Sequence, residues 1–170
     1  MKKTSSHWIL SLGFSSLLCL MIVVIYIPLS EMSTTISKME ALVKITNSKI
    51  STAHAMRDYI RQRGSTLSQM FLSEDYFERF ELFPLLAHHA ANYRTSRKHL
   101  LEYEMDEEEA TLLKKIDTIS EESYKTNVVA ADILLSRASQ KNIITAQIES
   151  HTARQKVLDL LDQLVDMQNR

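Results

Sequence analysis

The chain has 170 residues, of which 45% are hydrophobic and 24% are charged, and its 20 basic and 21 acidic side chains nearly cancel. Two glycines, two prolines and one cysteine exclude a disulfide scaffold and a turn-rich β-sandwich or barrel. The near-zero charge offers no broad positive surface, so we expect no nucleic-acid partner. These counts leave a single domain of long helices with few connections.

A continuous apolar segment covers residues 8–29 and contains no charged side chain. As a helix it is long enough to cross a hydrocarbon core of about 30 Å, which needs roughly 20 residues. Trp8 and Tyr26 lie near its two ends, where aromatic side chains favour the membrane interface. A cleaved signal peptide is the alternative, but its apolar part is shorter and ends in small residues. The sequence therefore predicts a transmembrane helix over 8–29, with residues 1–7 on the cytoplasmic side.

The remaining residues, 30–170, show the periodicity of amphipathic helices. A regular spacing of four and three predicts that the first of them packs along another helix. Capping-box spacing at Asp75–Glu78 and Asp106–Glu109 predicts where the second and third helices begin. The predicted helices cover about residues 30–72, 76–103, 106–135 and 140–169. The seam of the first consists of Met32, Ile36, Met39, Val43, Thr46, Ile50 and Ala53, and it continues less strictly through Met56, Ile60, Gly64, Leu67 and Phe71. The predicted inner faces of the other three include Phe77 and Phe80 in the second, Leu112 or Leu113, Ile116, Ser123 and Asn127 in the third, and Ile144 and Ile148 in the fourth.

Two residues disturb this regular pattern. Pro84 falls inside the second helix, where it removes a hydrogen bond. We favour a kinked helix over a short segment at 76–83 followed by a new helix at Pro84. Gly64 occupies a seam position, where it costs about 1 kcal/mol relative to alanine. Close approach of another helix is one reason for a glycine there.

Four helices joined by short turns predict an all-α fold, an N-terminal transmembrane helix followed by an antiparallel up-down-up-down four-helix bundle over residues 30–170. The first helix of the bundle would be about 63 Å long and the fourth about 45 Å. A fourth helix that returned to the bilayer would need about ten more residues. We therefore expect the sequence to stop shortly before a second membrane span.

No motif for catalysis is visible in the sequence. A Gly-rich phosphate loop, HExxH, CxxC and a nucleophile elbow are all missing, so we predict a non-enzyme without a cofactor or metal. His54 and His151 fall on the first and fourth helices, where a metal or pH-sensing site is conceivable, but solvated histidines are commoner. The acidic residues at 102–109 lack EF-hand spacing and suit the start of a helix.

Arg57, Arg61 and Arg63 on the first helix are the candidate ligand-binding residues. Arg57 and Arg61 are four positions apart and share a helix face. A guanidinium can hold a carboxylate or phosphate through two parallel hydrogen bonds, so this face fits a small anionic ligand between helices or subunits. The alternative is a solvated stripe of surface ion pairs, since Asp58 is nearby.

Residues 56–83 resemble the first-turn region of the four-helix-bundle sensor domains of methyl-accepting chemotaxis proteins. They are especially similar to the versions found at the front of bacterial proteins that make or degrade cyclic di-GMP. The shared features are the arginines of the first helix, an acidic turn and a Phe-Glu-Arg stretch at 77–79. Further matches lie at 94–101, 106–113 and 155–161, so the resemblance covers about residues 5–170. The departures are Pro84 and the lack of a second span, HAMP relay and output domain.

The resemblance implies the sensory input region of a dimeric signal-transduction receptor in the bacterial inner membrane, with its bundle in the periplasm. It implies a small ligand held by arginines of the first helix, for which Arg57, Arg61 and Arg63 are the candidates. Displacement of the fourth helix would relay the signal. The resemblance does not imply the identity of this ligand, because aspartate receptors space their arginines differently. The alternative function is a membrane-anchored helical adaptor or structural protein with no small-molecule ligand.

Overall fold

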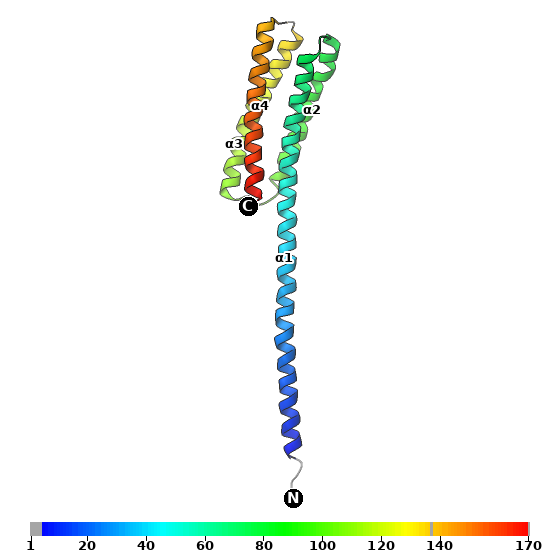
Figure 1. Ribbon diagram of the computed structural model, residues 1–170, viewed down its shortest axis with the longest axis vertical. Coiled ribbons are helices and arrows are strands. Elements are labelled where there is room, and N and C mark those ends of the chain that lie inside the picture. The colour runs from blue at the N-terminus through cyan, green and yellow to red at the C-terminus, as the bar shows by residue number, and fades with distance from the viewer. Residues whose placement is uncertain (1–4, 137, 170) are drawn as a thin grey trace. The chain divides into compact units, whose positions relative to one another are not determined.

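The structure of the chain is a computed structural model that describes residues 5–136 and 138–169. These residues form four α-helices and no strand, which confirms the all-α prediction (Figure 1). The connections between the helices are short. The helices are α1 (Ser5–Leu72), α2 (Tyr76–Leu100), α3 (Glu107–Leu135) and α4 (Gln140–Gln168).

The chain divides into two compact units, residues 1–44 and residues 45–170. The described part of the first unit belongs to α1 alone. The second unit is a helical bundle formed by the rest of α1 with α2, α3 and α4. Within this bundle consecutive helices run in opposite directions, as Figure 1 shows.

Among the described residues, no helix is both long enough and apolar enough to cross a membrane. The predicted span at 8–29 falls partly outside them, because the side chains at 8–11, 22–23 and 25–29 are not described. The backbone of this stretch belongs to α1 and continues without a break into the bundle. The membrane span itself stays a prediction.

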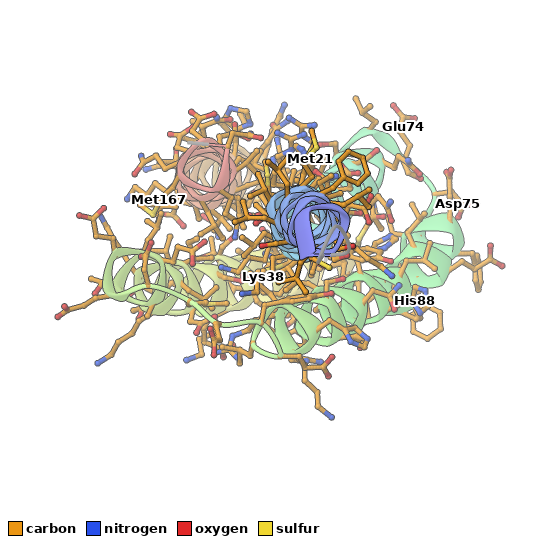
Figure 2. All side chains as sticks on the ribbon, turned by 90° about the horizontal axis from the view of Figure 1, so that it is seen from below. Met21, Lys38, Glu74, Asp75, His88 and Met167 are labelled. Atoms are coloured by element: carbon orange, nitrogen blue, oxygen red, sulfur yellow. The ribbon has the colours of Figure 1, made fainter. Side chains whose placement is uncertain are left out.

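The predicted helix starts are close to those observed, although one of the two capping boxes is incomplete. At α3, Asp106 Oδ1 accepts from the Glu109 amide at 2.7 Å and Glu109 Oε2 accepts from the Asp106 amide at 3.2 Å. At α2, Asp75 accepts from the Phe77 amide, but Glu78 accepts a hydrogen bond from Ser73 Oγ instead. Figure 2 shows Asp75 at the edge of the bundle.

α2 ends earlier than predicted and contains Pro84. The helix stops at Leu100 rather than near 103, because the amides of Glu102 and Tyr103 bond only three residues back, to the carbonyls of His99 and Leu100. Pro84 lies inside this helix, so the alternative of two separate segments is wrong. Arg79 donates to the carbonyls of Ser73 and Leu134, which ties the α1–α2 turn to the end of α3.

The buried face of α2 differs from the predicted one. Phe77 and Phe80 were expected in the core, but they are 75% and 58% exposed. On α4, Ile144 and Ile148 are likewise exposed, while the small residues Ala146 and Ser150 are buried. Small side chains let neighbouring helices approach closely, which a pattern of large apolar residues does not reveal. The buried residues of α2 are Leu86, Ala90, Tyr93 and Leu100.

The seam predicted for the first helix is buried only in its second half. Ala53, Met56 and Ile60 are buried in the bundle, and Leu67 continues the same face. The earlier seam residues belong to the first unit and are exposed: Met32, Ile36, Met39 and Val43.

The core of the bundle consists of two apolar clusters separated by a polar layer. One cluster contains Met56, Ile116 and Leu161, and the other contains Leu67 and Leu134. Polar side chains lie between them on α1, α3 and α4, all of them buried: Arg63, Ser120, Ser123, Asn127 and Ser150. Arg63 and Glu109 are the charged side chains among the buried residues of the described chain, and Glu109 lies in the first turn of α3.

Candidate ligand site around a buried arginine

The structure places the three candidate arginines in three different environments. Arg57 Nη1 donates to Asp162 Oδ1 of α4 at 2.7 Å, so a carboxylate of the bundle already neutralises it. Arg61 is exposed, and its closest carboxylate is Asp58 at 3.9 Å. Arg63 is buried inside the bundle, 2% exposed. Arg57 and Arg61 therefore do not form a shared site with Arg63.

Arg63 has very few polar partners for a buried cation. One guanidinium nitrogen donates to Ser123 Oγ of α3 at 3.2 Å, and the guanidinium carbon lies 5.6 Å from the centre of the Tyr124 ring. Its Nε is buried without a hydrogen-bond partner. Within residues 5–136 and 138–169, no carboxylate forms an ion pair with it.

Burial has a clear electrostatic effect on this side chain. The pKa of Arg63 is lowered to about 10, mainly by removal from water and to a lesser extent by the nearby Arg94, while the two tyrosines and Glu121 act in the opposite direction. At neutral pH the guanidinium is still charged. A buried charge without a counter-ion costs several kcal/mol, so the site favours any anion that can reach it.

A cavity of about 340 Å³ opens beside Arg63 and gives a ligand access to it. Three helices line it: Arg63 comes from α1, and Tyr93 and Arg94 come from α2. α3 contributes two acids and two further side chains, Ser120 and Tyr124. The complete lining is Arg63, Ala90, Tyr93, Arg94, Arg97, Asp117, Ser120, Glu121 and Tyr124.

The charges around this cavity do not balance. Arg97 forms two hydrogen bonds with Asp117, each 2.5 Å, and this pairing raises the pKa of Arg97. Glu121 lies 3.7 Å from Lys125. Arg63 and Arg94 are left without an ion pair among the described residues, so the cavity carries surplus positive charge.

Tyr93 adds a neutral donor to the cavity wall. Burial raises the pKa of its hydroxyl to about 12, so the group stays protonated at neutral pH. A protonated phenol can donate to a carboxylate or phosphate oxygen. Together Arg63, Arg94 and Tyr93 can hold an anion from two helices, with the ring of Tyr124 as an aromatic wall.

Sequence reasoning named Arg63 but did not find the rest of this site. Tyr93 and Tyr124 carry no local signal, because helical spacing does not tell which face of a helix is buried. A signal was present in Ser123 and Asn127, two polar residues at seam positions of the third predicted helix. Consecutive polar seam residues opposite a buried arginine indicate a polar layer in the core.

The two histidines considered for a metal site have separate surroundings. His54 Nδ1 is buried without a hydrogen-bond partner, whereas His151 Nδ1 lies 2.8 Å from an Arg154 nitrogen. In the described part of the chain, no group of three or more His, Cys, Asp or Glu side chains is arranged to hold a metal ion.

Comparisons with known proteins add no identification. No family model matches the chain, and no curated protein or solved structure shows significant similarity to it. The resemblance to chemotaxis sensor domains therefore stays a prediction.

Proposed function

We propose that the chain is the sensory input region of a membrane-anchored bacterial signalling receptor, and that a small anion binds in the cavity beside Arg63. The observation that carries this proposal is the buried, unpaired guanidinium in a cavity lined by three helices. A protein that only needs a stable core gains nothing from such a charge. A bound anion would neutralise the buried guanidinium and offset the cost of its desolvation.

A ligand at this position would affect how the helices pack. Arg63 belongs to α1 and Arg94 to α2, while Ser123 and Tyr124 belong to α3. An anion shared by Arg63 and Arg94 would favour the arrangement in which α1 and α2 bring these groups together. Differential affinity for two packings of one bundle is the physical basis of a receptor switch.

The membrane location is part of the same proposal. The apolar segment at 8–29 would span the bacterial inner membrane, with residues 1–7 in the cytoplasm and the bundle in the periplasm. The proposed partner is a second copy of the chain. The seam residues Met32, Ile36, Met39 and Val43 support it, because their exposed spacing is that of a coiled coil.

The test is a thermal-shift screen of the full chain in detergent against organic acids and amino acids at constant ionic strength. A ligand at a hundred times its Kd stabilises the folded state by about 2.7 kcal/mol, which raises the Tm by several degrees. We expect the shift to decrease in Arg63→Met. The matched control is Arg61→Gln, which removes an exposed arginine of the same helix and should keep the response.

The alternative function is a membrane-anchored helical adaptor, which the exposed seam of the first unit also suits. An adaptor would show no stabilisation by any compound of the screen. A shift as large in Arg63→Met as in the parent chain would place the ligand elsewhere on the chain and would overturn the assignment of the cavity.

A further inference from the structure

Gly64 lies near the C-terminal end of α1 and is buried against α4. A Cβ atom at this position would lie 2.2 Å from Nη1 of Arg154 and 2.4 Å from its Cδ. The side chain of Arg154 therefore occupies the space that any other residue would fill. The close approach expected for this glycine is made by an arginine side chain rather than by the backbone of another helix.

Arg154 has no carboxylate partner at this position. One of its guanidinium nitrogens lies 2.8 Å from His151 Nδ1, within hydrogen-bond distance. No ion pair is formed by it with the acids of the described chain. Partial burial lowers the pKa of Arg154, which agrees with a charge that lacks a counter-ion.

A groove of about 250 Å³ lies beside this guanidinium between α1 and α4. Arg154 and His151 are the titratable side chains of its lining, and no carboxylate lines it. Ser68 and Gln147 add polar groups, while Leu67 and Phe71 form an apolar wall. The groove thus combines a fixed positive charge, neutral polar groups and partial shielding from water.

We propose that the groove over Gly64 is a second anion site, in which Arg154 holds a small oxyanion between α1 and α4. The glycine keeps the guanidinium against α1, with donors of Arg154 left for two oxygens of a phosphate or a carboxylate. This site is separate from the cavity of Arg63, which lies among α1, α2 and α3. It does not depend on the function proposed above.

The experiment follows the Nε–H resonance of Arg154 by NMR in the full chain, labelled on arginine and held in detergent. Sodium phosphate and sodium acetate are titrated separately at constant ionic strength, with chloride as the reference salt, and Arg154→Lys assigns the signal. We expect a saturable shift with phosphate, acetate or both, which identifies the oxyanion class. Binding should persist in Arg63→Met and in Arg61→Gln.

The decisive variant is Gly64→Ala, because it separates ligand binding from stability. The methyl group displaces the flexible end of Arg154 while improving helix propensity, so the Tm should stay the same or rise. Anion affinity should fall roughly tenfold or more, as expected when a charged hydrogen-bonding pair is lost. The proposal is overturned if neither oxyanion differs from chloride, or if Gly64→Ala binds as tightly as the parent chain.

Discussion

Arg63 takes the place that an apolar side chain would hold in an ordinary helical core. It lies between two apolar clusters, donates to Ser123 and leaves its Nε unbonded. Its burial is a cost to folding because the described core supplies no neutralising charge. The surplus charge at this residue is thus the feature on which the proposed ligand site rests.

The first prediction concerns stability at this residue. Arg63→Met replaces a buried charge by an apolar side chain, so we expect the free energy of unfolding to increase by about 1 kcal/mol or more. Urea denaturation of the full chain in detergent measures the change. A decrease would mean that the Ser123 hydrogen bond and the Tyr124 contact stabilise the fold more than desolvation destabilises it.

The second prediction concerns His89, close to Arg63. Burial lowers the pKa of His89 below 6.5, and the charges of His88 and Arg63 lower it further. The unfolded chain therefore binds this proton more readily, and stability falls as the pH drops below 6.5. We expect the Tm to decrease less between about pH 7 and about pH 5 in His89→Gln than in the parent chain. An equal decrease of the Tm in both chains would contradict this prediction.

At the scale of helices, α2 is the least buried element of the bundle. It contributes four buried residues over its 25, whereas α3 and α4 contribute nine and eight over 29 each. Its interior proline also removes one backbone hydrogen bond. Since α2 carries Tyr93 and Arg94 of the cavity beside Arg63, the helix that would respond to the proposed ligand is also the one with the fewest buried residues.

The third prediction follows from this difference. We expect amides of α2 to exchange with deuterium faster than those of α3 and α4, since opening it exposes the least apolar surface. Pro84→Ala should slow exchange in α2 and raise stability by up to about 3 kcal/mol. Hydrogen-exchange mass spectrometry of the parent chain and of Pro84→Ala measures the exchange rates. Equal protection of all helices in the parent chain would contradict the prediction.

The fourth prediction concerns the start of α3, where one carboxylate makes two connections. Glu109 Oε2 accepts from Lys49 Nζ of α1 at 2.7 Å and also closes the capping box with Asp106. Glu109→Gln leaves a largely buried lysine unpaired, so we expect a loss of about 3–5 kcal/mol in the free energy of unfolding. Glu107→Gln, an exposed position in the same helical turn, should change stability by less than about 0.5 kcal/mol. A loss in Glu109→Gln as small as the loss in Glu107→Gln would mean that Lys49 finds another partner.

At the scale of the whole molecule, a row of solvent-exposed apolar side chains lies on the first unit. Met32, Ile36, Met39 and Val43 repeat at coiled-coil spacing, and each of them is about half exposed or more. A seam of this kind is buried when two copies of the helix pack side by side.

The fifth prediction tests this association. We expect the full chain to form dimers in detergent, and Ile36→Lys to weaken them because a lysine in the seam must lose water or separate the helices. Sedimentation equilibrium measures the association constant. Ala41→Lys adds the same charge about 200° around the helix from Met39 and should leave the dimer intact. Dimers that resist both substitutions would place the interface elsewhere.

The sequence by itself determined the helical class, the start of the third helix and the composition of its buried face. Those features depend on local rules. The capping box at Asp106–Glu109 and the spacing of Leu113, Ile116, Ser123 and Asn127 needed no knowledge of distant residues.

Only the tertiary structure decided which face of α2 and α4 is buried, and where each arginine lies. Small residues such as Ala146 and Ser150 set the closest approach of the helices, so the larger Ile144 and Ile148 remain outside. Arg57, Arg61 and Arg63 look alike along the chain. Arg57 pairs with a carboxylate of α4, Arg61 is exposed to solvent, and Arg63 faces a cavity among three helices. These differences arise only when the helices pack, because packing brings together residues that are far apart in the sequence.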